Sequence, residues 1–373
     1  MNSRRHFLRA SATATSAVVW GWSGMPVSAQ STGASPEAMS ARAVGFLKPR
    51  QDEQGAWSAQ RGPGITALVV TAMLRSKRVT PSDPAVVKGL GFLESFLSPK
   101  GGFAEGPTAN YVTAIALMAF HEANVDGRYK ARIAAAQNYL KGLQWDESEG
   151  KTPSDPFYGG AGYGSKSRPD LSNTSFFLDA LRDTGLPADD PALRKALVFV
   201  SRTQNLAGEF NDQPWAGKVN DGGFIYTPAL GGVSMADEPN LPNGGLRSYA
   251  SMTYAGLKSM IHAGLTRDDP RVKAALRFIR EHYTLDENPG LGQSGLFYYY
   301  QTFAKALAMY GDAKLVDAAG KEHDWRLDLV AALAKRQAAD GSWVNPADRF
   351  MEGDPNLVTS YALLALAYAR PKA

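Results

Sequence analysis

Residues 174–181 read TSFFLDAL, and this stretch carries the pattern that decides the fold. It has a threonine at its first place, a small residue six places on, and a large apolar residue seven places on. The same frame occurs six times, at spacings from 47 to 79 residues. A frame repeated in this way indicates a chain built from similar structural units. The six threonines are Thr66, Thr113, Thr174, Thr253, Thr302 and Thr359.

A second frame precedes each of these segments. It is an aromatic-aliphatic pair followed, five residues after the aromatic, by glutamine or another large side chain, as in Phe46-Leu47 with Gln51. Between the two frames lies a glycine turn closed by an aromatic residue, so each unit is predicted to be helix, turn, helix. The turns are Gly55/Trp57, Gly101/Phe103, Gly162/Tyr163, Gly222/Phe224, Gly295/Phe297 and Gly341/Trp343.

The starts of several first helices are marked by Asp-Pro pairs. Aspartate caps the free amides of a helix, and proline fits the first helical position, where no amide hydrogen bond is lost. Capping explains these acids better than metal binding does, because none of them continues into a five-residue acidic motif. The pairs are Asp83-Pro84, Asp190-Pro191 and Asp269-Pro270.

Six helical hairpins can stack as an open solenoid or close into a ring. A solenoid needs polar repeats at its two ends, but the first unit (ALVVTAML, 67–74) and the last (YALLALAYA, 361–369) are as apolar as the others. The sequence therefore predicts an all-α fold, an (α/α)6 toroid over residues 41–373. The second helix of each hairpin should form the inner ring, and the first helix the outer ring.

The first residues have the features of an export signal. Arg4 and Arg5 precede an apolar run that reaches Trp22, and Val27–Ala29 offers a small-residue cleavage site. We expect residues 1–29 to be a twin-arginine signal peptide, residues 30–40 a flexible linker, and the mature protein to be periplasmic or otherwise exported. The apolar run is shorter than the roughly 20 residues that a membrane span needs.

Composition excludes several kinds of function. Without residues 1–29 the chain has 37 basic and 36 acidic side chains, which gives no electrostatic footprint for nucleic acid. The absence of cysteine excludes disulfides, zinc-thiolate sites and cysteine nucleophiles. The histidines have no ligand spacing and no cofactor motif is visible, so neither a metal nor a cofactor is expected.

Helical periodicity predicts which side chains face the ring's interior. Counting each threonine as position zero, positions 0, +4 and +7 share one face, and positions −2, +2 and +5 lie opposite and should line the lumen. That lining is apolar and aromatic, with one charge of each sign, Asp179 and Lys258, at the same level of successive inner helices. The two should be neighbours. They form either a buried ion pair that fixes helix order or a site in which Asp179 acts as an acid or base.

Tyrosines gather at the predicted mouth of the ring, where the inner helices begin. Such a rim suits an apolar ligand with a polar or anionic head, although tyrosine-glycine loops also suit sugars. Some of these tyrosine side chains are expected only to hold loops in place. The candidate ligand-binding residues at the mouth and in the lumen are Tyr111, Tyr158, Tyr163, Ser172, Tyr226, Tyr249, Tyr254, Lys258, Tyr299, Tyr300 and Tyr361.

Two segments, QDEQGAW (51–57) and QAADGSW (337–343), fit the pattern Q-x3-G-x-W. The chain resembles the squalene-hopene and oxidosqualene cyclases, whose repeat signature this is, and with them the terpenoid cyclase and protein prenyltransferase toroids. The resemblance places the cyclases' D-x-D-D acid motif at residues 170–173, where only Asp170 keeps its carboxylate. The proton donor of these cyclases would fall on Ser172, with Asn173 as its helper. A serine hydroxyl is not acidic enough to protonate an alkene.

Three functions follow from these observations. The first is a binding or scaffold protein that accepts an isoprenoid or other apolar chain without protonating it. The second is a polysaccharide lyase or hydrolase acting at the mouth through Asp221 and Arg247. The third is residual terpene cyclase or isomerase chemistry using Asp170 or Asp179. The resemblance adds that full-length cyclases enclose substrate between two barrels, whereas this chain is long enough for one, and that prenyltransferases bind zinc partly through cysteine.

Overall fold

A computed structural model describes residues 35–104 and 106–370, and the expected signal peptide lies outside these residues. These described residues belong to one compact unit. Its inner helices are α2 (Pro63–Arg75), α4 (Ala109–Ala123), α6 (Leu171–Asp183), α9 (Ala250–His262), α11 (Leu296–Tyr310) and α13 (Pro355–Ala369). Its outer helices are α1 (Pro36–Leu47), α3 (Pro84–Glu94), α5 (Lys130–Lys141), α7 (Pro191–Arg202), α10 (Pro270–Glu281) and α12 (Trp325–Arg336).

Short elements fill the connections. A two-stranded antiparallel hairpin lies between α11 and α12, and it pairs Leu315 with His323. The remaining elements are β1 (Leu315–Val316), β2 (Glu322–His323), α8 (Ala216–Val219) and the 3-10 turns η1 (Lys48–Arg50), η2 (Ala59–Arg61), η3 (Gly106–Thr108), η4 (Glu147–Glu149), η5 (Ala229–Gly231) and η6 (Asp348–Phe350).

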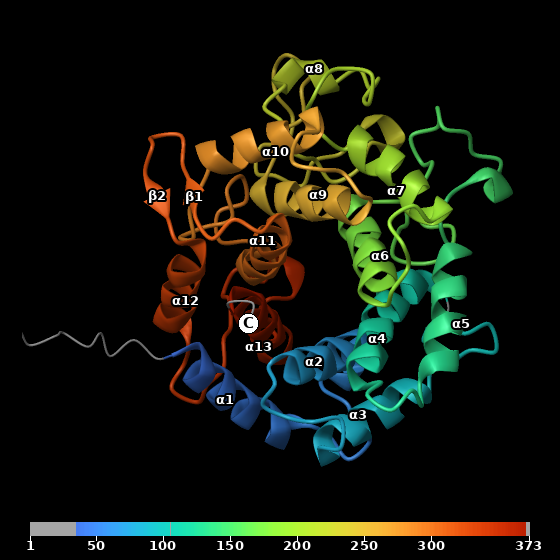
Figure 1. The fold of residues 1–373 in the computed structure, drawn as a ribbon, viewed down its shortest axis with the longest axis vertical. Helices are drawn as coiled ribbons and strands as arrows, with labels where there is room; N and C mark the ends of the chain where they lie inside the picture. Colours follow the sequence, from blue (N-terminus) through green and yellow to red (C-terminus); the bar gives the residue numbers. More distant parts are fainter. Residues whose placement is uncertain (1–34, 105, 371–373) are drawn as a thin grey trace, which may run out of the picture. The chain divides into compact units, whose positions relative to one another are not determined.

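The six inner helices close into a ring. Each packs on the next in the order α2, α4, α6, α9, α11, α13, and α13 packs back on α2. Figure 1 looks along the ring, with α1, α3, α5, α7, α10 and α12 outside the inner helices. The predicted six-hairpin (α/α)6 toroid is therefore confirmed. Within the described residues, no helix is both long enough and apolar enough to cross a membrane.

The outer helices begin where the Asp-Pro pairs stand. The carboxylates of Asp83, Asp190 and Asp269 each accept a hydrogen bond from the second amide of their helix, at 3.1, 2.8 and 2.9 Å. Proline follows each aspartate at the first helical position. These carboxylates are caps, as the sequence predicts, and proline supplies the required φ at a place where no amide bond is lost.

The repeated glutamines join neighbouring hairpins. The side-chain amide of Gln51 donates to the carbonyl of Gly55 in its own turn and to that of Ala85 in the next outer helix, both at 2.9 Å. Gln144 and Gln204 make the same pair of bonds. Gln337 makes it across the closure of the ring, to Gly341 at 2.9 Å and to Met39 of α1 at 3.0 Å.

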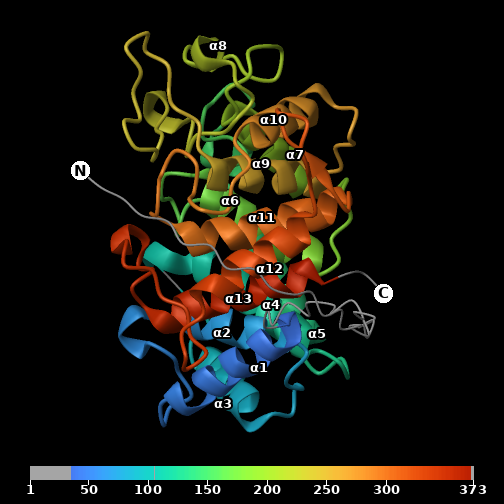
Figure 2. The ribbon, with the colours of Figure 1, turned by 90° about the vertical axis from the view of Figure 1, so that its left-hand side faces the viewer.

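The turn glycines allow this close approach. Gly341 has φ +91°, and a β-carbon there would lie 2.5 Å from the carbonyl oxygen of Arg42 in α1. An L side chain is disfavoured by the backbone angle and by the contact. In the side view of Figure 2, α1 and α12 lie beside α13 at this closure. Since α1 begins at Pro36, it includes residues that composition assigns to a linker at 30–40; its apolar face, including buried Met39, belongs to the core.

The repeated threonines fasten the turns to the inner helices. In five repeats the threonine hydroxyl accepts a hydrogen bond from a turn amide at 3.0–3.1 Å. In the third repeat that amide belongs to Ala161, and Gly159, with φ +81°, is the glycine that packs on the next outer helix. The predicted pair Gly162/Tyr163 is therefore wrong, because Gly159 and Ala161 hold these places, three and two residues earlier. Tyr163 is left free of the turn and is about half exposed.

The fifth repeat departs from the threonine frame. Thr302 donates to the carbonyl of Tyr298 within its own helix and accepts no bond from the turn. Tyr300 instead holds the fifth place of α11, which Thr113 and Thr359 hold in α4 and α13. The assignment of Thr302 to this frame is therefore wrong by two residues. Inward positions on α11 move accordingly, from Tyr300 to Tyr298 and from Leu307 to Lys305.

Candidate functional site

A cavity of about 400 Å³ lies at the N-terminal halves of the inner helices. Its lining includes the −2 positions of four helices and the +2 positions of two, which are faces that periodicity predicts to be inward. The inner helices contribute Tyr111, Ser172, Phe176, Ser251, Met252, Tyr298, Leu357 and Tyr361; the loops contribute Tyr163, Arg168, Tyr226, Met235, Tyr249, Asn288, Leu291, Gly295, Phe350 and Met351.

The first inner helix contributes nothing to this lining. Its −2 position is Gly64, and a β-carbon there would meet the ring of Tyr111 at 3.2 Å. The Tyr111 ring thus covers α2 and itself forms the wall. It contacts the rings of Phe176 and Tyr163, with centroids 5.5 and 5.8 Å apart. Edge and tilted contacts of this kind give a rigid aromatic wall.

A pair of hydroxyls lies at the position where the sequence resemblance places the cyclase acid. Ser172 lies on the cavity wall, and its oxygen is 2.9 Å from the phenol oxygen of Tyr298. Burial raises the pKa of Tyr298. Both groups are therefore neutral at ordinary pH, and neither can deliver a proton to a carbon-carbon double bond.

Asp170 lies behind the wall and not in the lining. It is 2% exposed and caps α6, accepting from the backbone amide and the side-chain amide of Asn173, both at 2.8 Å. Burial raises the pKa of Asp170 to about 6, against the opposing hydrogen bonds from Asn173 and Tyr226. A carboxyl group with a raised pKa is a weaker acid than a free one.

The inner-helix amides at the mouth are already bonded. Glu352 accepts from the amides of Phe297 and Tyr298 at 3.0 and 2.8 Å, and so caps α11. Asn288 accepts from the amide of Ser251 in α9 at 3.0 Å. On α4 the first amides donate to the carbonyl of Tyr163, and Asp354 caps α13. The amides bonded in this way are not available to an anionic ligand.

Below the cavity the lumen is closed by an ionic cluster that we call the plug. Asp179 accepts from Lys258 at 2.6 Å and from His262 at 2.9 Å, and Lys305 is 3.1 Å away. Although burial opposes its ionisation, the two ammonium groups hold the pKa of Asp179 well below its ordinary value. Burial lowers the pKa of His262, so this ring donates as a neutral imidazole.

The plug continues to the C-terminal ends of the inner helices. Arg75 pairs with Glu122 at 2.7 Å and with Asp183 at 2.8 Å, and its guanidinium also contacts the Tyr368 hydroxyl. Lys305 joins the two halves, because it is 2.9 Å from Asp183 as well as near Asp179. Three cations thus face three carboxylates: Arg75, Lys258 and Lys305 with Glu122, Asp179 and Asp183.

The predicted neighbours Asp179 and Lys258 are therefore in contact, as a structural ion pair. Both are at most 2% exposed and neither lines the cavity. The ammonium of Lys258 lies 5.9 Å from the centre of the Phe176 ring, which separates it from the cavity above. With a cation on each side, Asp179 stays ionised and is a poor candidate for an acid.

Six of the candidate ligand-binding residues line the cavity, and five do not. Those in the lining are Tyr111, Tyr163, Ser172, Tyr226, Tyr249 and Tyr361. Lys258 is in the plug, and Tyr254 packs among the rings of Tyr299 and Phe303. The hydroxyls of Tyr158, Tyr299 and Tyr300 bond to Glu147, Thr284 and Leu285 at 2.7, 2.7 and 2.5 Å, away from the cavity.

The candidate pair Asp221 and Arg247 is not in the lining either. Asp221 accepts from the amide of Gly223 at 2.9 Å and from the hydroxyl of Ser248 at 2.8 Å, and burial raises its pKa. Arg247 donates to the backbone and side chain of Glu238 at 3.2 and 3.4 Å on the surface. Both side chains serve loop structure.

Sequence reasoning missed three features of the cavity. Arg168 was not among the candidates, although it stands two residues before Asp170. Tyr298 was not among the candidates either, because the shifted frame of the fifth repeat placed Tyr300 at the inward position. Phe350 and Met351 belong to the loop before α13, and no periodic signal marks a loop residue as inward. Among the described residues, no group of three or more acids and histidines could hold a metal ion.

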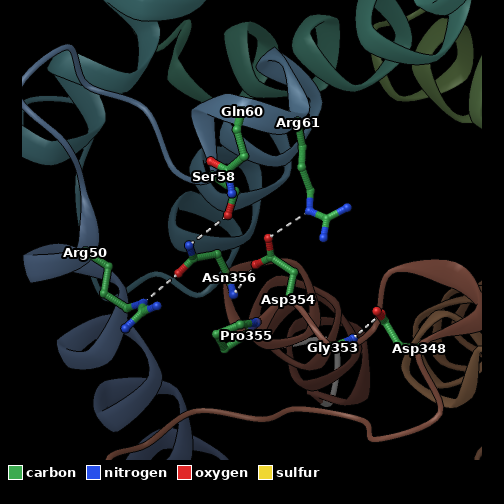
Figure 3. A pocket seen from close by; sticks show the side chains of 9 residues that line it. All are labelled: Arg50, Ser58, Gln60, Arg61, Asp348, Gly353, Asp354, Pro355 and Asn356. Carbon is green, nitrogen blue, oxygen red and sulfur yellow. Dashed lines mark hydrogen bonds and ion pairs between the residues drawn. The ribbon is translucent and has the colours of Figure 1, made fainter.

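A second hollow of about 470 Å³ opens on the surface where the last repeat meets the first. In Figure 3 the Asn356 side chain lies between Arg50 and Ser58, bonded at 3.1 and 3.0 Å, while Arg61 reaches Asp354 at 3.6 Å. These polar groups form hydrogen bonds and an ion pair with one another. We therefore assign this hollow to closure of the ring and treat the central cavity as the candidate functional site.

The chain matches no protein-family profile and no curated protein sequence. Among solved structures, it is similar to the type II terpene cyclase MstE from Scytonema, at 14% identity over 90% of this chain and 98% of that one, with a TM-score of 0.53. It is also similar to a variant of MstE in complex with geranylgeranyl dihydroxybenzoate, its substrate. The identity is 14% over 90% of this chain and 97% of that one, and the TM-score is 0.54. A third similar structure is a family 76 glycoside hydrolase (mannosidase) from Bacteroides thetaiotaomicron, Bt3792. The identity is 10% over 89% of this chain and 97% of that one, and the TM-score is 0.52.

These likenesses establish the fold and correct one expectation. This chain covers nearly the whole of a chain described as a type II terpene cyclase. A single toroid is therefore long enough for such an enzyme, and chain length does not count against cyclase chemistry here. The chemistry of Ser172 and Asp170 is what counts against it. What the comparisons show of the chain itself is an α/α toroid.

Proposed function

We propose that this protein binds an apolar, isoprenoid-like ligand in its central cavity and does not protonate it. The observation that carries the proposal is an aromatic cavity whose lining, among the described residues, has no carboxylate and includes the Ser172–Tyr298 hydroxyl pair. Apolar walls with a few polar groups are typical of sites for small hydrophobic ligands. The shared fold with MstE, whose substrate carries a geranylgeranyl chain, supports the isoprenoid class.

The hydrolase and cyclase alternatives do not have comparable support. Glycoside hydrolysis uses two carboxyl groups that flank the sugar bond, whereas the described lining has none. Protonation of an alkene needs a strong acid, and the nearest candidate, Asp170, is buried behind the wall with a raised pKa. Asp179 is held ionised by Lys258 and Lys305.

Direct binding tests the proposal. We expect calorimetry to detect geranyl and farnesyl alcohols binding to the wild-type protein, and mannose oligosaccharides not to bind. Leu357, 2% exposed, lies on the wall, so Leu357→Trp should fill part of the cavity and weaken binding about tenfold or more. Leu97→Trp is the matched control, because Leu97 is 37% exposed and outside the lining.

Three results would count against the proposal. If farnesol failed to bind, or bound equally well to Leu357→Trp, the cavity would not be the ligand site. If wild-type protein converted a prenyl substrate into cyclic products detected by mass spectrometry, the claim that it does not protonate its ligand would be wrong.

Export through the twin-arginine route is also a proposal, supported by Arg4, Arg5 and the apolar run after them. Replacing both arginines by lysine should leave the protein inside the cell, as measured by fractionation and immunoblotting. Equal export of the variant would contradict this.

A further inference from the structure

Arg168 is the one charged side chain among the residues that line the cavity in the described part of the chain. It is exposed, and its guanidinium lies 5.8 Å from the centre of the Tyr226 ring. A guanidinium stacked on an aromatic face is held in place while its donors remain available to a ligand. Arg168 therefore offers a positioned cation at an apolar cavity.

The other basic residues nearby are already engaged. Lys166, two residues away, pairs with Glu149 at 2.5 Å, and Arg349, beside the cavity residue Phe350, pairs with Asp237 at 3.3 Å. Within residues 35–104 and 106–370, Arg168 has no ion pair or side-chain hydrogen bond. Asp170 is close enough for Arg168 to lower its pKa, but its carboxylate is bonded to Asn173.

The amides at the inner-helix ends do not replace Arg168 as an anion site. Amides at the starts of α4, α9 and α11 are bonded to Tyr163, Asn288 and Glu352, and α6 is capped by Asp170. The guanidinium is thus the group in the lining that can balance a negative charge.

The cavity also has room for an apolar chain attached to the head group. Its volume is about 400 Å³, and its aromatic lining suits a geranyl or farnesyl chain. The chain would run from Arg168 toward Phe176, below which the plug closes the lumen.

We propose that the ligand is an anionic amphiphile, with a carboxylate or phosphate head paired to Arg168 and a short isoprenoid-like chain inside the cavity. This inference rests on the proposed function, because it assumes that the cavity binds an apolar chain. It adds the charge of the head and the residue that recognises it.

The test compares ligands that differ only in the head. Farnesol, farnesoic acid and farnesyl monophosphate would each be titrated into wild-type protein, Arg168→Gln and Arg168→Lys by calorimetry. For the wild type we expect both anions to bind about tenfold or more tightly than farnesol, as charge-assisted hydrogen bonds are stronger than neutral ones. Arg168→Gln should lose this preference, measured against the affinity of the same variant for farnesol, and Arg168→Lys should keep part of it.

Lys166→Gln is the control for a general change in charge, and it should leave all three affinities unchanged. If all three ligands bound the wild type equally, the inference about the head would be overturned while the proposed function stood. The same holds if Arg168→Gln kept the preference for anions. If none of the ligands bound any variant, the proposed function itself would fail. A preference for only one of the two anions would identify the head as that one.

Discussion

The carboxylate of Asp179 lies 2.6 Å from the ammonium of Lys258, at the centre of the toroid and beneath the floor of its cavity. The two residues stand on neighbouring inner helices, α6 and α9, each five places after the repeated threonine. Lys305 on α11 joins them at the same level. The lumen is therefore divided along its length into an aromatic cavity near the mouth and an ionic plug below it.

Removing the central carboxylate should destabilise the protein strongly. Asp179→Asn leaves Lys258 and Lys305 buried with one anion fewer, and breaking a buried pair in this way costs about 3–5 kcal/mol of the free energy of unfolding. Chemical denaturation would measure it. Glu322→Gln is the control, because Glu322 pairs with Lys314 on the surface with both side chains more than half exposed, and should cost less than about 1 kcal/mol. Equal effects would contradict a stabilising role for the plug.

Asp170 should make stability fall as the pH rises. Burial raises its pKa in the folded state to about 6 from an ordinary 3.8, so the folded protein binds a proton more tightly than the unfolded chain does. Its stabilising contribution is complete below about pH 4 and is lost as the pH rises through about 6, on the order of 2–3 kcal/mol.

The variant Asp170→Asn isolates this contribution, because asparagine also caps helices but does not titrate. As the pH rises from 4 to 7, the melting temperature of the wild type should fall relative to that of the variant. A difference independent of pH would mean that the carboxyl is not held protonated beside Tyr226 and Arg168.

A methyl group at the ring closure should be harmful. Gly341→Ala places a β-carbon 2.5 Å from the Arg42 carbonyl oxygen at a φ of +91°, and we expect a loss of at least about 2 kcal/mol. In Gly91→Ala the new β-carbon has no neighbour within 4 Å, in the exposed part of α3. That variant should gain about 0.5–1 kcal/mol through helix propensity. Thermal unfolding of both would reveal opposite signs, and like signs would contradict the steric role of the turn glycine.

The glutamine at the closure should hold the first outer helix in place. Gln337→Met removes the amide that donates to Met39 and Gly341, and leaves two carbonyls unpaired at a cost of about 1–3 kcal/mol. Hydrogen exchange of the α1 amides should accelerate relative to those of α7. Gln60→Met, at an exposed position, should change neither quantity. Unchanged exchange in α1 would show that the ring closes without this tie.

The repeats could be predicted from the sequence because their signals are local. The threonine, glutamine and glycine positions each have a hydrogen-bonding or steric task within one hairpin or between adjacent ones, so they recur at matching places. The prediction went wrong in the fifth repeat, where Tyr283 and Tyr300 replace the glutamine and the threonine. Thr302 matches the threonine frame by chance, and this match shifted the predicted inward positions of α11 by two residues. Tyr298, which lines the cavity, was therefore not predicted to face inward.

The sequence by itself determined the helical hairpins, their caps, the closed ring and the inward face of most inner helices, because helical periodicity and turn chemistry depend on near neighbours in the chain. Only the tertiary structure decided which inward residues share the cavity and which form the plug. That division depends on how far each side chain lies along the ring axis and on which loops fold over the mouth. Arg168 and Met351 come from such loops. They line the same cavity as Tyr298 because distant parts of the chain pack together.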